Sequence, residues 1–317
     1  MIRLNVLHSR RGHSRLLRRS GAFSTATTPP QHKFDGEASD LYARIFTQHY
    51  HPHGPWQHIL NASETYLQHK SIPEAASILD IATGPGEPAM SLAKLFPASQ
   101  VLATDISPDM IHKATQAFTD AKLTNIEAQE MDAHDLSVIE SNSVDLVTCC
   151  YGLMFCSDQA QALNEIQRVL KPGGQYITTV WLDLQIMHLI RPMMTDVLGH
   201  APPPPPINPN SLAAPGLLED LLNNAGLELI STTEDSYPFV MGGQPGDSVD
   251  FGFKMATLPV HQTLIELAEE SPEVLTTAKD AFWKHMETGK FGTFDQATGG
   301  ITIPNNVFKM AVAQKSV

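Results

Sequence analysis

The sequence predicts an α/β protein built on a doubly wound, parallel sheet, and two observations predict this class. A glycine-rich turn at Thr83-Gly84-Pro85-Gly86 follows a short apolar run and leads into a helix start at Pro88. Apolar runs also alternate with helical patterns as far as residue 181, and alternation of this kind forms parallel sheets. The runs are Ile78–Ile81, Gln100–Thr104, Asn125–Gln129, Val144–Cys149 and Gln175–Trp181.

The first 34 residues have the composition of a targeting segment. They carry six arginines and one lysine, and no acidic residue precedes Asp35. A compact apolar stretch is missing, which disfavours secretion, whereas an arginine-rich, acid-poor segment is typical of a mitochondrial presequence. We therefore expect residues 1–34 to be a transit peptide to the mitochondrial matrix. The alternative is a disordered basic tail on a cytoplasmic protein.

Residues 35–60 are expected to be helical structure that precedes the sheet and, with residues 182–300, serves as a lid and builds the acceptor pocket. Tyr42, Phe46 and Tyr50 have i, i+4, i+8 spacing, which places three rings on one helical face. A carboxylate or cysteine that would complete a metal site is missing from the adjoining histidine tract, so no metal is predicted. That tract consists of His49, His51, His53 and His58.

Caps mark the helices between the predicted strands. Ser107 followed by Pro108 is the pattern of an N-cap with proline at the first helical position. Asp158 is expected to cap a second helix, which Pro172-Gly173-Gly174 stops. These helices should cover the sheet.

The pattern changes after Trp181. The prolines of Pro202–Pro206 are expected to form a stiff surface connection. Three helical patterns within residues 243–290 indicate an insertion that covers the active cleft, so residues 243–300 are expected to act as a lid. The remaining expected elements are a helix over Ser211–Ala225, a strand over Leu227–Thr232, and a final hairpin partner in the sheet from Ile301–Ile303 and Val307–Ala313.

Composition limits the function. The chain has 317 residues and 42% hydrophobic content, enough for one large domain over residues 35–317, and no apolar run reaches the ~18 residues that a membrane span needs. Seven of its 21 basic side chains precede residue 35, which leaves 14 against 34 acidic ones. Such a body repels nucleic acid and anionic membranes.

The glycine-rich turn is the first candidate binding site. Gly84 and Gly86 let the backbone approach a ligand closely, and the helix start at Pro88 offers N–H groups. Three interpretations share this turn. They are a turn without a ligand, a nucleoside-like cofactor site, and a dinucleotide-binding oxidoreductase, because Gly84-x-Gly86-x-x-Ala89 also fits that fingerprint.

Three carboxylates stand at the ends of successive predicted strands. Asp80, Asp105 and Asp132 should meet at one edge of a parallel sheet, where open α/β sheets bind ligands. Asp105 lies 19 residues beyond Gly86 and could accept both ribose hydroxyls of a nucleoside. A helix-capping role is the alternative for Asp105.

Taken together, these motifs resemble the class I S-adenosylmethionine-dependent methyltransferases. The resemblance covers residues 77–181, the expected cofactor-binding core. It implies a Rossmann-like methyltransferase sheet, mostly parallel with an antiparallel last strand, and a helical lid insertion. The matching segments are Leu79–Gly86, Ala103–Ser107, Met131–Ala133, Ser143–Val147 and Val169–Gly174.

The resemblance implies roles for the turn after the first strand. Gly84 and Gly86 would make room for the methionine part of the cofactor, and Asp80 would organise the loop, through water to the ammonium group. Ala82 stands where the family has its first glycine.

The later motifs would hold the nucleoside. Asp105 would bind the ribose and Ile106 would pack against adenine. Asp132 and the Ala133 N–H would read the adenine edge. Cys149 would face the methionine part, with a plain core cysteine as the alternative.

Within the class, the run from Arg168 to Gly174 resembles the ubiquinone and menaquinone C-methyltransferases. That branch continues to Glu-x-Ser after its fifth strand, where this chain has Val180-Trp181-Leu182. Its N-terminal Tyr-Asp-x-Met signature is only faintly echoed by Leu41-Tyr42-Ala43-Arg44.

The predicted function is methyl transfer to a small, largely apolar metabolite at an oxygen, nitrogen or carbon atom. An acceptor that must lose a proton would need a base, for which Tyr151, His134 and His188 are candidates by position. The alternative function is a catalytically silent cofactor-binding protein that serves as an assembly or interaction factor, because a fold does not determine a function.

Overall fold

One mixed sheet runs through the described part of the chain. The computed structural model describes residues 36–69, 75–203 and 208–317, so the predictions for residues 1–34 fall outside the described residues. The strands are β1 (Ser77–Ile81), β2 (Gln100–Asp105), β3 (Ile126–Glu130), β4 (Val144–Cys150), β5 (Leu170–Asp183), β6 (Leu227–Met241), β7 (Thr293–Asp295) and β8 (Gly300–Lys315).

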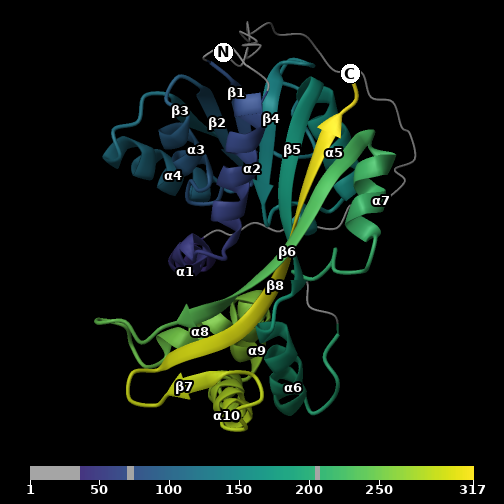
Figure 1. The fold of residues 1–317 in the computed structure, drawn as a ribbon. Coiled ribbons are helices and arrows are strands. Elements are labelled where there is room, and N and C mark those ends of the chain that lie inside the picture. Colours follow the sequence, from purple (N-terminus) through teal and green to yellow (C-terminus); the bar gives the residue numbers. More distant parts are fainter. Residues whose placement is uncertain (1–35, 70–74, 204–207) are drawn as a thin grey trace, which may run out of the picture.

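The sheet has the predicted doubly wound topology. Its strand order is β3-β2-β1-β4-β5-β8-β6, and β7 pairs with β8 off this path. Strands β1 to β5 are parallel neighbours, whereas β8 runs antiparallel to β5 and β6. The mostly parallel sheet with an antiparallel strand is therefore confirmed (Figure 1). Because the order reverses beside β1, a crevice is expected at the carboxyl ends of β1 and β4.

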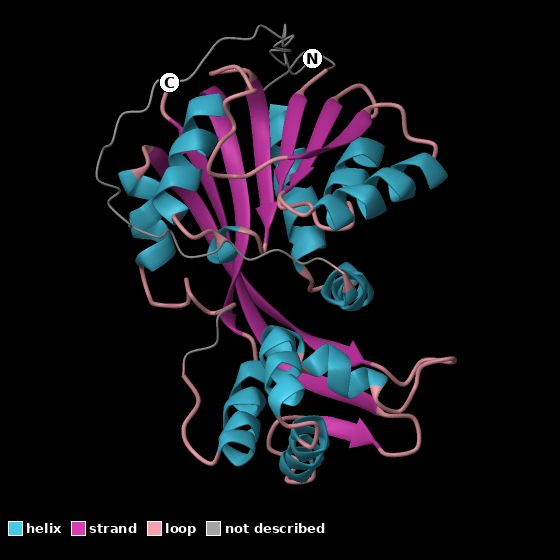
Figure 2. Ribbon diagram, turned by 180° about the vertical axis from the view of Figure 1, so that it is seen from behind, coloured by secondary structure: helices cyan, strands magenta, loops and turns pink. Residues whose placement is uncertain are grey.

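Helices cover both faces of the sheet. Helix α2 lies on one face, and α5 and α7 lie on the other (Figures 1 and 2). The helices are α1 (Glu37–Phe46), α2 (Pro55–His69), α3 (Ala89–Leu95), α4 (Pro108–Asp120), α5 (Gln159–Val169), α6 (Ile186–Leu198), α7 (Leu217–Asn224), α8 (Phe251–Ala256), α9 (His261–Glu270) and α10 (Val274–Met286), with 3₁₀ turns η1 (Thr47–Tyr50), η2 (Leu153–Phe155) and η3 (Leu258–Val260). None of the described helices is long and apolar enough to cross a bilayer.

The two predicted helix caps are confirmed. The Ser107 hydroxyl accepts the N–H of Met110 at 3.2 Å, and the Asp158 carboxylate accepts the N–H of Gln161 at 2.9 Å. Each cap satisfies an N–H group that the first helical turn leaves without a partner.

Strands β6 and β8 are longer than the sequence suggested. The segments Ile301–Ile303 and Val307–Ala313, expected as a final hairpin partner in the sheet, form the single strand β8, which pairs antiparallel with β5 and β6. The intervening Asn306 is fully buried, and its side-chain amide donates to the carbonyls of Tyr237 and Ile303 at 3.2 and 3.0 Å. This side chain supplies hydrogen bonds where the β6 register shifts, so the strand continues.

The C-terminal end of β6 and the N-terminal end of β8 form part of a second lobe. Those ends, together with β7, α6, α8, α9 and α10, lie beyond the narrow crossing of β6 and β8 (Figure 1). The lobe contains residues 243–300, which were expected to form a lid, and also α6 and the end of β6. The expected helix Ser211–Ala225 is shorter and begins at Leu217.

The N-terminal segment is helical, but its three rings do not share one face. Helix α1 ends at Phe46 and tightens into η1, which turns Tyr50 outward to 56% exposure. Tyr42 and Phe46 remain neighbours, with ring centroids 6.1 Å apart. The predicted single stripe is wrong for Tyr50, because a 3₁₀ turn advances 120° rather than 100° per residue.

Candidate functional site

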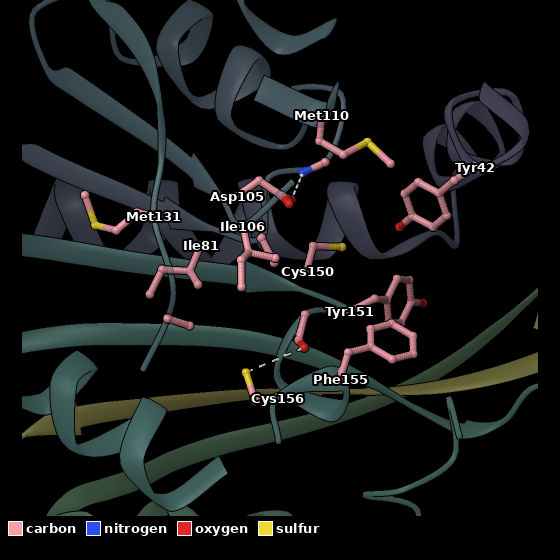
Figure 3. A pocket seen from close by; sticks show the side chains of 14 residues that line it. Tyr42, Ile81, Asp105, Ile106, Met110, Met131, Cys150, Tyr151, Phe155 and Cys156 are labelled. Carbon is pink, nitrogen blue, oxygen red and sulfur yellow. Dashed lines mark hydrogen bonds between the residues drawn. The ribbon is translucent and has the colours of Figure 1, made fainter. Parts of the chain in front are cut away.

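A cavity of about 690 Å³, its open mouth included, lies at the carboxyl ends of the parallel strands. In Figure 3, Asp105 and Ile106 lie on one side of it, with Tyr151 and Phe155 on the other. Its lining residues are Tyr42, Ile81, Ala82, Gly84, Asp105, Ile106, Met110, Met131, Ala133, Cys150, Tyr151, Gly152, Phe155 and Cys156. We call it the cofactor cavity.

Asp105 joins the glycine-rich turn to the residue that caps α4. Its Oδ2 accepts the N–H of Gly84 and its Oδ1 accepts the N–H of Ser107, both at 2.9 Å. The carboxylate therefore holds the glycine-rich turn and the start of α4. It also lines the cofactor cavity, and each carboxylate oxygen can accept further hydrogen bonds.

The two glycines of the turn differ in what they make room for. A Cβ on Gly84 would lie 3.5 Å from the Tyr42 ring, on the cavity side. A Cβ on Gly86 would lie 2.8 Å from the Phe118 ring and 3.3 Å from Cα of Ala114. Gly86 therefore permits close packing of α4, and its expected place beside the methionine part stays a prediction.

Asp80 lies beneath the turn rather than in the cavity. Its side chain is fully buried, and Oδ1 accepts the hydroxyl of Thr148 at 2.5 Å. Burial raises the pKa of its carboxyl to about 7. Oδ2 of Asp80 and Oγ1 of Thr83 are buried without a hydrogen-bond partner in the described structure. Each of these two oxygens under the loop can therefore still form a hydrogen bond.

The helix after the turn offers no free N-terminus. The Glu87 carboxylate is buried and accepts the N–H of Ser91 at 3.0 Å. The same side chain also binds the Tyr50 hydroxyl. The start of α3 is therefore capped from within the protein.

Asp132 and His134 form a closed arrangement after β3. Oδ1 of Asp132 lies 2.8 Å from the backbone nitrogen of His134 and 2.6 Å from its ring Nδ1. Nε2 of the same ring accepts the N–H of Asp158 at 3.1 Å. Both ring nitrogens are engaged, so His134 connects two loops. Ala133 lines the cofactor cavity, whereas Asp132 lies beside it.

Cys150, rather than Cys149, lines the cofactor cavity. Successive side chains of β4 point to opposite faces of the sheet, and both thiols are buried. Cys149 is 2% exposed and is not among the lining residues, which favours the alternative of a core cysteine. A Cβ added to Gly152 would lie 2.7 Å from the sulfur of Cys149.

A second cavity of about 620 Å³, its mouth included, adjoins the first between the two lobes. It shares Tyr42 and Phe155 with the cofactor cavity. We call it the acceptor cavity. Its lining residues are Tyr42, Ile45, His49, Phe155, Trp181, Leu184, Ile186, Pro209, Phe239, Met241, Met255, Ala256, Leu258 and Pro259.

Helix α1 is fastened to both lobes and so places Tyr42 at this boundary. Asp40 pairs with Lys113 of α4 at 2.5 Å. Glu37 pairs with Lys254 of α8 at 2.9 Å. Arg44 adds an ion pair with Asp247. The pairs explain how a segment far from the core in sequence becomes part of the site.

His49 is a site residue that the sequence interpretation missed. It is 3% exposed, lines the acceptor cavity, and packs against an aromatic cluster that includes Tyr151 and Trp181. The tract had been interpreted as a surface or lid segment. A signal was present, because His49 follows Tyr42 and Phe46 at positions i+7 and i+3 of the same buried stripe.

The three candidate bases occupy different places. Tyr151 lines the cofactor cavity, but burial raises the pKa of its hydroxyl well above the usual value, so it stays protonated. His134 is engaged as described. His188 lies on α6 beside Asp183 at 2.7 Å and lines neither cavity.

The cofactor cavity suits S-adenosylmethionine better than a dinucleotide. Ile106, Met110 and Met131 give an apolar surface for a base beside the carboxylate of Asp105. Among the described residues no lysine or arginine lines this cavity, so a pyrophosphate would find no cation. The described residues also contain no group of histidines, cysteines or carboxylates that could hold a metal.

Comparison with known proteins finds similarity in the core. Residues 78–174 match the family model described as a methyltransferase domain. Over 100 residues the chain is 37% identical to the demethylmenaquinone methyltransferase of Deinococcus radiodurans. This match covers 32% of this chain and 41% of that protein. Over 105 residues it is 35% identical to the ubiquinone/menaquinone biosynthesis C-methyltransferase UbiE of Desulfotalea psychrophila. This match covers 33% of this chain and 41% of that protein. The chain thus spans about two fifths of the length of these relatives.

A solved structure resembles a larger part of the chain. The YcgJ protein from Bacillus subtilis aligns with a TM-score of 0.50 and 16% identity, over 81% of this chain and 99% of that one. At this identity the likeness supports the fold, including the sheet topology.

Proposed function

We propose that this chain, whose core is a class I S-adenosylmethionine-dependent methyltransferase domain, transfers a methyl group to a small, largely apolar acceptor. One observation carries the proposal. The cofactor cavity and the acceptor cavity share Tyr42 and Phe155, so molecules in the two cavities would meet at these side chains. Methyl transfer is an in-line displacement that depends mainly on such alignment and on the exclusion of water.

The bound cofactor would supply an electrophilic methyl group on its sulfonium sulfur. Asp105 would accept hydrogen bonds from the ribose hydroxyls, while Ile106 and Met131 pack against the base. Ala82 and Gly84 would bring the backbone close to the methionine part. On the other side, the rings of Tyr42 and Phe155 would limit where the acceptor atom can lie.

The acceptor cavity favours an uncharged molecule. Within the described chain no aspartate, glutamate, lysine or arginine lines it, and methionine, leucine, isoleucine and proline dominate the wall. A charged acceptor would lose its hydration without gaining a partner. The relatives named for demethylmenaquinone and ubiquinone/menaquinone biosynthesis make a quinol ring one acceptor to test.

The test measures binding and turnover separately. The full chain is incubated with methyl-labelled S-adenosylmethionine and an extract of small metabolites, and labelled products are separated by chromatography. Calorimetry with S-adenosylhomocysteine measures occupancy of the cofactor cavity. Labelled product with the full chain, absent after heat inactivation, supports the proposal.

The same measurements define the result that would contradict the proposed methyl transfer. Cofactor binding without labelled product from extracts of several sources would overturn the enzyme proposal and favour a silent cofactor-binding factor. For a variant of the cofactor cavity such as Asp105→Asn, the control for binding is Asp120→Asn. Asp120 is an exposed residue at the end of α4 and contacts Gln116.

A further inference from the structure

Three buried side chains form a hydrogen-bonded chain between the two cavities. Nδ1 of His49 lies 2.7 Å from the hydroxyl of Tyr237, which lies 3.3 Å from the hydroxyl of Tyr151. Their exposed fractions are 3%, 1% and 3%. Tyr151 lines the cofactor cavity and His49 lines the acceptor cavity, so the chain ends at both.

The hydrogen-bond network indicates where the protons lie. Within the described structure, the Tyr151 hydroxyl has only the Tyr237 hydroxyl as a hydrogen-bond partner. All hydroxyl protons find acceptors only if Tyr151 donates to Tyr237 and Tyr237 donates to Nδ1 of His49. The neutral ring then carries its proton on Nε2, a nitrogen with no hydrogen-bond partner in the described structure.

The surroundings keep this ring uncharged. His49 lies among the rings of Phe46, Trp56 and Phe239. Burial lowers the pKa of its imidazole to about 3. A neutral imidazole with a proton on Nε2 is a hydrogen-bond donor in an otherwise apolar wall.

We propose that His49 determines acceptor specificity by donating a hydrogen bond from Nε2–H to an oxygen atom, of the carbonyl or phenol type, on an uncharged and otherwise apolar acceptor. This inference rests on the proposed function, since it assigns the acceptor to this cavity. A buried donor left without a partner is costly, so molecules that lack the oxygen would bind more weakly. Cationic amines would meet a donor where they need an acceptor, and are disfavoured.

The test uses binding of two simple probes and needs no turnover. 1-Decalone carries one carbonyl oxygen on a bicyclic hydrocarbon, and decalin is the same skeleton without oxygen. Trp181 lines the acceptor cavity, so its fluorescence can report both probes with the full chain and no cofactor. Exchanging His49 for Phe keeps a ring but removes the donor, whereas His49→Gln retains an N–H group.

We expect His49→Phe to weaken 1-decalone binding about tenfold and to leave decalin binding unchanged, and His49→Gln to recover part of the loss. His58→Gln is the matched control, because His58 belongs to the same tract but pairs with Asp235 and lines neither cavity. Unchanged ketone affinity in His49→Phe would overturn the inference.

A measurement on the unaltered protein guards against variants that fail to fold. Nitrogen-15 NMR of the histidine rings at neutral pH should show His49 as the neutral tautomer with its proton on Nε2. A proton on Nδ1 would overturn the inference. Neither measurement depends on the cofactor, so calorimetry with S-adenosylhomocysteine tests the proposed function separately.

Discussion

The backbone N–H of Gly84 donates a 2.9 Å hydrogen bond to the carboxylate of Asp105, which joins the loop after β1 to the end of β2. The residue expected to bind ribose is therefore also part of the scaffold. Replacing it by alanine would alter the loop and the ligand contacts together. A substitution that preserves shape is needed to separate the two roles.

Asp105→Asn is closest to the parent in shape and removes the charge, so charge-assisted hydrogen bonds to ribose become weaker. Its amide oxygen can replace only one of the two carboxylate acceptors, and urea denaturation of the variant measures the cost of losing the other backbone contact. We expect affinity for S-adenosylhomocysteine to fall roughly ten- to a hundredfold, because hydrogen bonds to a charged group contribute about 1.5–3 kcal/mol. Calorimetry measures the affinity, and Asp120→Asn is the control. Unchanged affinity would refute the assignment of Asp105 to ribose.

Asp80 should make stability depend on pH. Burial raises its pKa to about 7 from the ordinary 3.8, so between these values the folded chain holds a proton that the unfolded chain releases. The free energy of unfolding should therefore fall as pH rises from about 4 to about 7, by up to roughly 4 kcal/mol, and then level off. Urea denaturation at pH 5 and pH 8 measures the change.

Asp80→Asn cannot take up this proton. The variant should lose less stability than the parent between pH 5 and pH 8, while its amide oxygen still accepts the Thr148 hydroxyl. Thr148→Val is a companion variant, because it removes the one hydrogen bond to Oδ1 and leaves the titrating group in place. Parallel pH profiles for parent and Asp80→Asn would count against a protonated carboxyl in the core.

The two glycines of the turn should respond differently to alanine. In Gly84→Ala the new Cβ would lie 3.5 Å from the Tyr42 ring and 3.9 Å from the Phe46 ring, both ordinary contact distances, so we expect a loss of about 1 kcal/mol from the positive φ and weaker cofactor binding. In Gly86→Ala the Cβ would approach Phe118 to 2.8 Å at φ +113°, and we expect a larger loss of about 2–4 kcal/mol. Urea denaturation compares the two, and equal losses would contradict the separate roles.

The parallel core could be predicted because its strands are buried on both faces. Every residue of β1 and β4 is buried, and such strands appear as continuous apolar runs. Strand β6 could not be followed in the same way. Its residues from Ser231 to Glu234 are exposed and polar, so neither a run nor an alternation marks the middle of the strand.

The acceptor cavity was harder to predict than the cofactor cavity. The predicted residues of the latter, from Asp80 to Cys149, follow successive parallel strands and end at one sheet edge, so sequence order places them together. His49 and Tyr237 are 188 residues apart and meet only because β6 continues into the second lobe. A local pattern does not encode that distance.

Gly152 provides the last prediction, through its contact with Ala82. A Cβ on Gly152 would lie 2.5 Å from Cβ of Ala82 and 2.7 Å from the sulfur of Cys149, at an ordinary φ of −94°. Gly152→Ala should therefore cost about 2–3 kcal/mol through overpacking alone. Ala82 itself has φ +55°, so Ala82→Gly should be nearly neutral, because relief of strain offsets the added flexibility of the unfolded chain.

Combining the two changes tests the contact directly. Ala82→Gly removes the atom that a Cβ at position 152 would strike, so Gly152→Ala should cost at least about 1 kcal/mol less in that background. Gly199→Ala is the matched control, since it has nothing within 4 Å and a φ of +73°. Its cost should be about the same with either residue at position 82. If the cost of Gly152→Ala is equally unchanged, Ala82 and Gly152 do not pack as the structure has them, and the small residue at position 82 has another cause.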